Sequence, residues 1–206
     1  VNRRQREVLT DQGLSFTYDR LLFATGSVPF IIPIPNHNHA CVLSFRDIQD
    51  VEAMLSATTN KKKVAVIGGG LLGLEAANGL LKRGIEVTVI HDTSCLMNRQ
   101  LDSEAAHLLQ TQLERNGMKF RMGVVTKEIV AKDAEHLSHL SFREGEDLPT
   151  DLVIMAVGIR PNVALAKQIG LQVDKAILVN DTMQTFDPRI YAVGECVQHR
   201  GSLFGL

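Results

Sequence analysis

The chain has 206 residues and an almost balanced charge, with 22 basic and 23 acidic side chains and a formal net charge of −1. Its length is enough for one substantial domain or for one domain plus parts of another, and its hydrophobic content of 45% is ordinary for a globular protein. The charge balance argues against nucleic acid or an anionic membrane as the main partner. No apolar run approaches the roughly 20 residues of a transmembrane helix.

The cysteines predict a reducing environment. Cys41, Cys95 and Cys196 are odd in number and far apart, and they form neither a CxxC pair nor a disulfide framework. We therefore expect a cytoplasmic protein. The chain opens in a polar segment without Met and stops at SLFGL, so we interpret it as a piece of a longer polypeptide.

The first quarter of the chain predicts short strands, a connector and a helix. LLFAT (21–25) is typical of a buried strand, and Gly26 ends it. Residues 28–39 contain three prolines and no helical period, which predicts an extended connector. Apolar residues at helical spacing predict a helix over 45–57.

Residues 64–92 are the most informative stretch. They read as a β-branched strand, a glycine turn, a helix over 71–83 and a second strand over 86–90. The turn matches the GxGxxG dinucleotide fingerprint in the context that gives it meaning. In such a fingerprint, Gly68 allows the tight turn, Gly70 lets the backbone approach a pyrophosphate, and Gly73 lets helix and strand pack closely. The helix N-terminus then offers N–H groups to the phosphates.

The end of the second strand departs from the usual pattern. An acidic residue there normally accepts hydrogen bonds from the ribose 2′-OH and repels a 2′-phosphate, but this chain has His91 followed by Asp92. His91 can still hydrogen-bond a ribose hydroxyl, or it is simply a solvated residue at the strand end. The neighbouring Asp92 disfavours the 2′-phosphate of NADPH. We therefore expect NADH to be preferred to NADPH. Glu75 is expected in the first helical turn, where an acid suits the helix dipole without excluding a role near the nicotinamide.

The rest of the chain continues the alternation of strands and helices. We expect a helix over 102–116, a strand over 118–122, an antiparallel meander over 124–150 and a buried strand ending at Gly158. Two more strands, with a proline-containing link, are expected within 177–195. This order predicts an α/β fold with a parallel sheet.

Three segments occur in the order of one known superfamily. They are TYDRLLFATGS (17–27), VAVIGGGLLGLE (64–75) and TFDPRIYAVGEC (185–196). The chain resembles the pyridine nucleotide-disulfide oxidoreductases, FAD- and NAD(P)H-dependent flavoprotein reductases in which a Rossmann-like NAD(P)H domain is inserted into an FAD-binding domain. The resemblance covers nearly the whole chain. It implies that residues 1–60 end the first half of the FAD domain and its connector, 61–158 form the NAD(P)H domain, and 159–206 begin the second half of the FAD domain.

The resemblance also implies which residues bind each cofactor. Glu195 stands where the family usually has an Asp for the ribityl chain of FAD, one methylene longer. The residues implied for NAD(P)H are Gly68, Gly69, Gly70, Leu71, Leu72, Gly73, Glu75, His91, Asp92, Val157 and Gly158, and those implied for FAD are Ala24, Thr25, Gly26, Gly194 and Glu195.

Within the superfamily, three further stretches resemble the large subunits of NAD(P)H-dependent assimilatory nitrite reductases: LSFRDIQDVEAML (43–55), CLMNRQLD (95–102) and VGECVQHRG (193–201). That likeness implies hydride transfer from NADH to FAD and onward electron flow to an iron–sulfur cluster and a siroheme, where nitrite becomes ammonia. The ligands of those two centres are expected in another part of the parent chain. The terminal acceptor and the oligomeric state, with a homodimer as one possibility, stay open.

Three alternatives remain beside this interpretation. Rubredoxin or ferredoxin reductases and NADH oxidases share the hydride path and differ in the acceptor. An isolated nucleotide-binding piece would have no activity of its own. Metal or thiol chemistry is disfavoured, because Cys196 and His199 supply two potential ligands where a zinc site needs four.

Cys196 is expected as a small residue at the start of a helix beside the flavin. We expect no metal and no catalytic acid, base or nucleophile, since the cofactors carry the chemistry.

Overall fold

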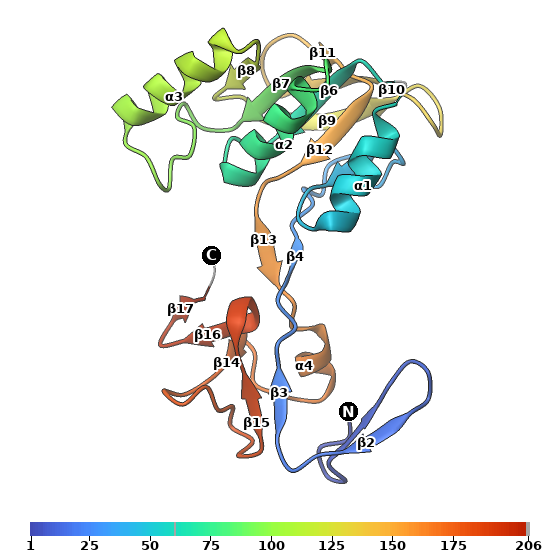
Figure 1. The fold of residues 1–206 in the computed structure, drawn as a ribbon, viewed down its shortest axis with the longest axis vertical. Helices are drawn as coiled ribbons and strands as arrows, with labels where there is room; N and C mark the ends of the chain where they lie inside the picture. The colour runs from blue at the N-terminus through green and yellow to red at the C-terminus, as the bar shows by residue number, and fades with distance from the viewer. Residues whose placement is uncertain (60, 205–206) are drawn as a thin grey trace. The chain divides into compact units, whose positions relative to one another are not determined.

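The computed structural model describes residues 1–59 and 61–204, so the predicted border at residue 60 and residues 205–206 lie outside the described part. The chain divides into two compact units. The continuous unit is Pro29–Gly158, and the discontinuous unit combines Val1–Val28 with Ile159–Leu206. Figure 1 shows the elements of both units.

A five-stranded parallel sheet forms the centre of the continuous unit. Its strand order is β5-β12-β6-β7-β8, and each neighbouring pair is parallel. The expected parallel α/β architecture is confirmed. The strands are β5 (Val42–Ser44), β6 (Lys63–Ile67), β7 (Glu86–His91), β8 (Lys119–Met122) and β12 (Leu152–Met155).

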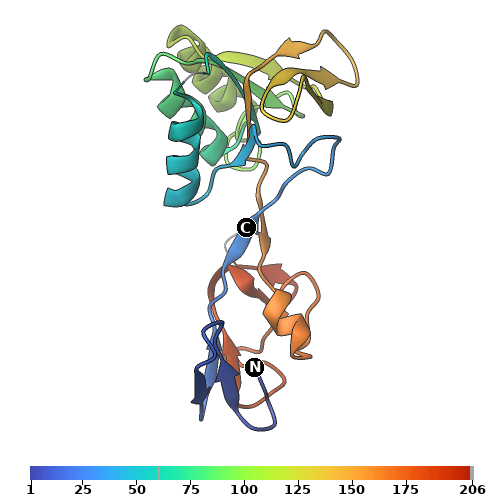
Figure 2. The same ribbon diagram turned by 90° about the vertical axis from the view of Figure 1, so that its right-hand side faces the viewer.

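Helices cover one face of this sheet and a meander covers the other, as Figures 1 and 2 show together. The helices are α1 (Ile48–Ala57), α2 (Leu71–Leu81) and α3 (Ser103–Arg115). The antiparallel meander consists of β9 (Thr126–Ala131), β10 (Leu137–Phe142) and β11 (Leu148–Pro149), as predicted for residues 124–150. One apolar core joins these layers, with Leu80 of α2, Ile154 of β12 and Leu140 of β10 fully buried.

Side-chain caps explain where two of the helices begin. The Asp47 carboxylate accepts hydrogen bonds from the N–H groups of Gln49 and Asp50, so α1 starts at Ile48 and not at the predicted residue 45. Asp102 accepts a hydrogen bond from the Ala105 N–H and starts α3 as expected. Each cap satisfies N–H groups that have no partner inside the helix.

The border between the units differs from the sequence-based division at one place. Residues 29–59 were grouped with the preceding segment, but the structure groups them with the continuous unit. The reason is long-range packing: β5 pairs with β12, and Met54 of α1 is buried in the core of that unit. At the other border, the structure changes units between Gly158 and Ile159.

The discontinuous unit is built from short strands. Its parallel pair β3–β15 joins segments from opposite ends of the chain, and its own core includes Phe23, Ile190 and Cys196. Its helix and its last two strands were not among the elements predicted from the sequence. The elements are β1 (Glu7–Leu9), β2 (Ser15–Thr17), β3 (Leu21–Phe23), β4 (Ser27–Pro29), β13 (Ile159–Pro161), α4 (Ala164–Gln168), β14 (Ile177–Leu178), β15 (Ile190–Ala192), a 3-10 helix (Gly194–Cys196), β16 (Val197–His199) and β17 (Ser202–Leu203).

Across the described residues, every helix is too short or too polar to cross a membrane.

The carboxylate of Asp151 links β12 to the start of β6. It accepts hydrogen bonds from the N–H groups of Lys62 and Lys63, each at 3.0 Å. Partial burial raises the pKa of this carboxyl group, but the two N–H donors and the charges of nearby lysines lower it more, so the net pKa lies below the ordinary value. The folded state therefore favours the ionised form of Asp151.

We predict that Asp151 contributes stability that acid removes. A depressed pKa in the folded state stabilises the fold above the unfolded pKa, and this contribution is lost as the pH falls through the folded value. The Asp151→Asn variant should be less stable than the native chain at neutral pH. The difference in unfolding free energy should shrink between about pH 5 and about pH 3 in urea titrations. A difference that stays constant over this range would contradict the prediction.

Candidate functional site

The glycine turn between β6 and α2 is held by close backbone contacts. Gly68 has a φ of +123°, which is costly for residues with a side chain, and its N–H donates to the Ile90 carbonyl at 2.8 Å. A Cβ on Gly68 would lie 2.3 Å from the carbonyl oxygen of Ala156. A Cβ on Gly73 would lie 2.0 Å from the carbonyl oxygen of Gly68. Only hydrogen atoms fit at these two positions, so the helix begins directly on the strand end.

Gly70, the second glycine of the GxGxxG fingerprint, has a different environment. It is the N-cap of α2, no side chain caps it, and a Cβ built there would meet nothing within 4 Å. The first hydrogen bond of the helix runs from the Leu74 N–H to the Gly70 carbonyl at 3.0 Å. The N–H groups of the first turn thus have no partner inside the helix and lie beside open space. This arrangement favours an anionic group at the N-terminus of α2.

The turn lies where the sheet order reverses. The chain runs from β6 to β7 and β8 on one side, and it returns with β12 on the other side of β6. In open parallel sheets, ligands bind at the carboxyl ends of the strands at such a reversal. Met155 of β12 pairs with Ile67 of β6, which brings the predicted residues Val157 and Gly158 to the same edge as Gly68.

His91 and Asp92 have distinct environments at the end of β7. The His91 side chain is 12% exposed, and its Nδ1 lies 3.3 Å from the Gly69 N–H, which donates to it. The alternative of a solvated strand-end histidine is therefore wrong, because the ring packs beneath the glycine turn. The Asp92 side chain is 71% exposed, with Oδ1 at 3.4 Å from His91 Nδ1.

Glu75 does not occupy the predicted place. The first turn of α2 contains no acidic residue, because the helix starts at Leu71 and Glu75 is its fifth residue. Its side chain is exposed. Leu71 and Leu72, in the first turn, are also exposed, at 56% and 36%.

The residues predicted for FAD meet in the discontinuous unit. β3 and β15 run parallel, so the segments that follow Phe23 and Ala192 leave the same edge. The Val193 N–H donates to the Phe23 carbonyl at 2.9 Å. Ala24, Thr25 and Gly26 are thereby brought beside Gly194 and Glu195.

Two residues that the sequence analysis missed hold this edge together. The Ser27 hydroxyl donates to Glu195 Oε2 at 2.7 Å, across 168 positions of sequence. Asn162 accepts a hydrogen bond from the Thr25 hydroxyl through its carbonyl at 2.6 Å, and its N–H donates to the Gly26 carbonyl at 2.9 Å. Ser27 directly follows the Ala-Thr-Gly segment, but no sequence pattern pairs it with Glu195.

The expectation for Cys196 is wrong. It ends the 3-10 helix Gly194–Cys196 and precedes strand β16, so it does not start a helix. Its thiol is fully buried and donates to the Val193 carbonyl at 3.2 Å. His199 pairs with Asp181 at 2.7 Å. The three cysteines are free, and the described residues contain no cluster of three or more potential metal-binding His, Cys, Asp or Glu side chains.

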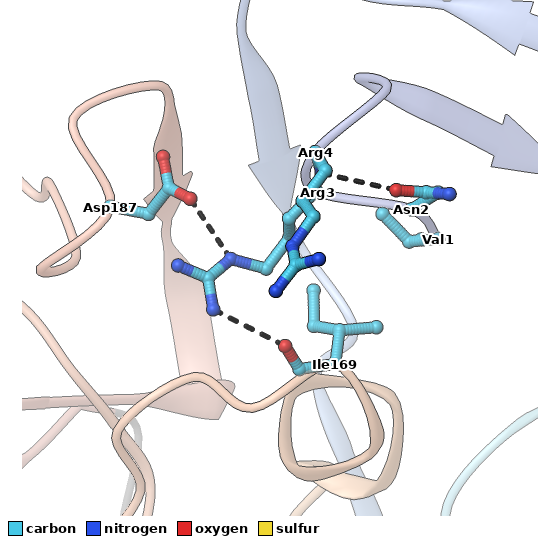
Figure 3. Close-up of a pocket in the computed structure, with 6 residues that line it drawn as sticks. All are labelled: Val1, Asn2, Arg3, Arg4, Ile169 and Asp187. Atoms are coloured by element: carbon cyan, nitrogen blue, oxygen red, sulfur yellow. Dashed lines mark hydrogen bonds and ion pairs between the residues drawn. The ribbon is translucent and has the colours of Figure 1, made fainter.

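A cavity of about 590 Å³ lies in the discontinuous unit, away from the predicted site residues. Figure 3 shows Arg3 reaching across it to Asp187, with Nε at 2.9 Å from Oδ2, and to the Ile169 carbonyl at 3.3 Å. Burial raises the pKa of the Asp187 carboxyl group, but the Arg189 N–H and the Arg3 side chain lower it more, so that its net pKa is low. This ion pair fastens the first residues to the rest of the unit.

Comparisons with known proteins assign the chain to one family. The family profile described as "pyridine nucleotide-disulphide oxidoreductase" matches residues 1–204. Two relatives come from Bacillus subtilis (strain 168): "Nitrite reductase [NAD(P)H]" at 52% identity and "Assimilatory nitrate reductase electron transfer subunit" at 45%, each over the whole chain. The chain spans about a quarter of these relatives, 25% and 26% of their lengths.

A solved structure agrees with the fold of the chain. The ferredoxin reductase for the CYP199A2 system from Rhodopseudomonas palustris matches with a TM-score of 0.92 and 30% identity. The match covers 100% of this chain and 52% of that one.

We predict opposite effects of alanine at two glycines of the same helix. Gly73→Ala should lower the free energy of unfolding by about 1–3 kcal/mol, because the new methyl group would collide with backbone and force α2 away from β6. Gly79→Ala should raise it by roughly 0.5–1 kcal/mol, because a Cβ there meets nothing within 4 Å and alanine favours helix. Urea unfolding followed by circular dichroism measures both. Equal effects of the two substitutions would contradict the contact at Gly73.

Proposed function

The chain belongs to the pyridine nucleotide-disulphide oxidoreductase family, and we propose that it is the NADH-oxidising flavoprotein portion of a nitrite reductase large subunit. The observation that carries this proposal is the pairing of two strand-edge sites in one chain. One site has a dinucleotide turn in the continuous unit, and the other has a carboxylate at the end of β15 in the discontinuous unit. The 52% identity to a nitrite reductase supports the choice within the family.

The continuous unit is proposed to hold the pyridine nucleotide. The open space beside Gly70 and the N–H groups that start α2 fit a pyrophosphate, which needs close backbone approach and positive potential. Leu71 and Leu72 are exposed at the same helix end. Val157 and Gly158 follow the neighbouring strand. We keep Gly68, Gly69, Gly73 and Glu75 in the proposed set, the glycines as turn residues and Glu75 at the helix surface.

Asp92 supports the preference for NADH. Its carboxylate is 71% exposed at the end of β7, where it can accept hydrogen bonds from a ribose hydroxyl and repel a 2′-phosphate. The His91 ring packs against the turn and is engaged with Gly69. Asp92 is therefore the side chain to which we assign the selective contact, and His91 stays in the proposed set as its neighbour.

The discontinuous unit is proposed to contribute part of the FAD site. Ala24, Thr25 and Gly26 offer backbone at one strand end, and Gly194 and Glu195 lie at the adjacent end. The Ser27 hydroxyl orients the Glu195 carboxylate by donating to Oε2. A fixed carboxylate at a strand end fits the hydroxyl groups of a ribityl chain.

The chemistry of the proposed reaction is that of the cofactors. FAD, when bound, would accept a hydride from NADH and pass electrons to an acceptor elsewhere in the parent protein. The residues of this chain bind and orient, and we assign none of them a catalytic proton transfer. The proposal extends to an iron–sulfur cluster and siroheme outside this chain, nitrite as terminal acceptor, a homodimer and a cytoplasmic location. The three free cysteines support the location.

A second candidate is an electron-transfer protein with another acceptor. The relative named as an assimilatory nitrate reductase electron transfer subunit and the structurally similar ferredoxin reductase both favour it. These proteins share the proposed cofactor sites and differ in what receives the electrons.

We predict that the chain binds NADH at least about tenfold more tightly than NADPH. Repulsion between the Asp92 carboxylate and a 2′-phosphate, together with loss of the ribose hydrogen bond, accounts for this ratio. Calorimetric titration of the native chain and of Asp92→Asn measures it, and the variant should bring the two affinities together. Tighter binding of NADPH by the native chain would contradict the preference.

We also predict that the 206-residue chain alone does not oxidise NADH with a dye acceptor. It contains one GxGxxG fingerprint, at Gly68–Gly73, and that turn belongs to the proposed nucleotide site. Absorbance at the NADH band should stay constant with dye and excess FAD. It should fall when a complete flavoprotein reductase is added as a positive control. Turnover by the chain alone would contradict the assignment of a partial FAD site.

A further inference from the structure

Gly69 is held through both polar groups of its backbone. Its N–H donates to His91 Nδ1 at 3.3 Å, and its carbonyl accepts from the Met97 N–H at 2.9 Å. A Cβ on Gly69 would lie 2.8 Å from two ring carbons of His91 and 2.9 Å from a methyl group of Leu96. Residues 91–97 therefore enclose the middle glycine of the turn, and we call this segment the 91–97 clamp.

The geometry at Gly69 places His91 Nδ1 as a hydrogen-bond acceptor. A ring nitrogen that accepts a hydrogen bond carries no proton, so the acceptor Nδ1 requires neutral imidazole with its hydrogen on Nε2. The imidazolium form has donors at both nitrogens and cannot accept from Gly69. Nε2 is itself buried and has no hydrogen-bond partner among the described residues.

Asp92 provides the alternative partner. Its Oδ1 lies 3.4 Å from His91 Nδ1, a distance at which a protonated Nδ1 would be attracted to the carboxylate. Protonation would thus exchange one interaction of Nδ1 for another. The Gly69 N–H would lose its acceptor, and the carboxylate proposed for the ribose would turn toward the ring.

We propose that His91 is a positioning residue whose neutral imidazole fixes the glycine turn through Gly69, so that acidification weakens dinucleotide binding. This inference rests on the proposed function of the continuous unit and adds to it a means of control. His91 can influence dinucleotide binding through Gly69, because the Gly69 peptide lies next to the N-terminus of α2.

The other groups around His91 carry little charge toward its ring. The glycine turn has no titratable side chain, and α2 contributes exposed Glu75. The clamp contributes Cys95, which is partly exposed. On β8, His91 pairs with Met122, and the neighbouring Arg121 lies over the Phe142 ring and donates to the Glu146 carbonyl. Among the described residues, Asp92 is the charged side chain at ion-pairing distance.

The test combines the native chain with two variants of His91. His91→Asn keeps an acceptor near the Nδ1 position and does not titrate, whereas His91→Phe keeps a ring without an acceptor. His136→Asn is the matched control, because that histidine is exposed in the meander and also pairs with an aspartate, Asp133, at 2.8 Å. The ligand is ADP-ribose, which contains the pyrophosphate and adenosine ribose of the dinucleotide and no nicotinamide. Calorimetry gives its affinity at about pH 8 and about pH 5.5, a range in which histidines titrate.

We expect the native chain and His136→Asn to lose about tenfold in ADP-ribose affinity on acidification. His91→Asn should bind within about threefold of the native chain at about pH 8 and show little pH dependence. His91→Phe should bind about tenfold more weakly at about pH 8, because the buried Gly69 N–H loses its acceptor. Native affinity that rises in acid, or full affinity in His91→Phe, would overturn the proposal.

A second measurement does not depend on ligand or on the folding of a variant. In the unliganded native chain at about pH 8, the nitrogen-15 shifts of the His91 imidazole should report an unprotonated Nδ1 and a protonated Nε2. The reverse tautomer would overturn the clamp. If ADP-ribose does not bind the native chain at all, the proposed function fails, and the imidazole shifts still decide whether His91 holds Gly69.

Discussion

The close approach of α2 to β6 is the contact on which the proposed nucleotide site depends. The Gly68 carbonyl and the Gly73 backbone meet without room for a methyl group, and Gly68 lies similarly close to the backbone of Ala156, which follows β12. The ends of β6, β7 and β12 and the start of α2 thereby meet at Gly68. Because close-packed backbone deforms little, the direction of the first helical N–H groups follows from these contacts. The glycines serve the ligand indirectly, by fixing where the helix begins.

Much of the continuous unit could be predicted from the sequence because its signals are local. The strand before Gly68, the helix that ends near Gly84 and the meander after residue 124 follow from periodicity and turn residues. The environment of His91 could not be predicted in this way. Whether a polar side chain at a strand end faces solvent or packs beneath a neighbouring turn depends on the path of the next loop. Leu96 and Met97 set that path, and no pattern relates them to Gly69.

The discontinuous unit was harder to predict for a related reason. Its elements are two to five residues long, too short for a period to be counted, and the pairing of β3 with β15 joins opposite ends of the chain. The resemblance to a family placed Gly26 and Glu195 near each other, but it contained no information on Ser27 or Asn162. Cys196 was misplaced because a Gly-Glu-Cys run can start a helix as readily as it can form one 3-10 turn before a strand. The buried thiol, donating to the Val193 carbonyl, belongs to the second arrangement.

The continuous unit has a structural consequence for the other one. Pairing of β3 with β15 would demand closure of a loop of more than 160 residues if the intervening chain were unfolded, at a considerable cost in entropy. The continuous unit lowers that cost, because its two ends meet: the Phe30 N–H donates to the Gly158 carbonyl at 2.9 Å. Once Pro29–Gly158 has folded, the connection between β3 and β15 is effectively shorter than in the unfolded chain. Folding of the continuous unit thus favours the pairing of β3 with β15, and with it the contact between Ser27 and Glu195 at the proposed FAD site.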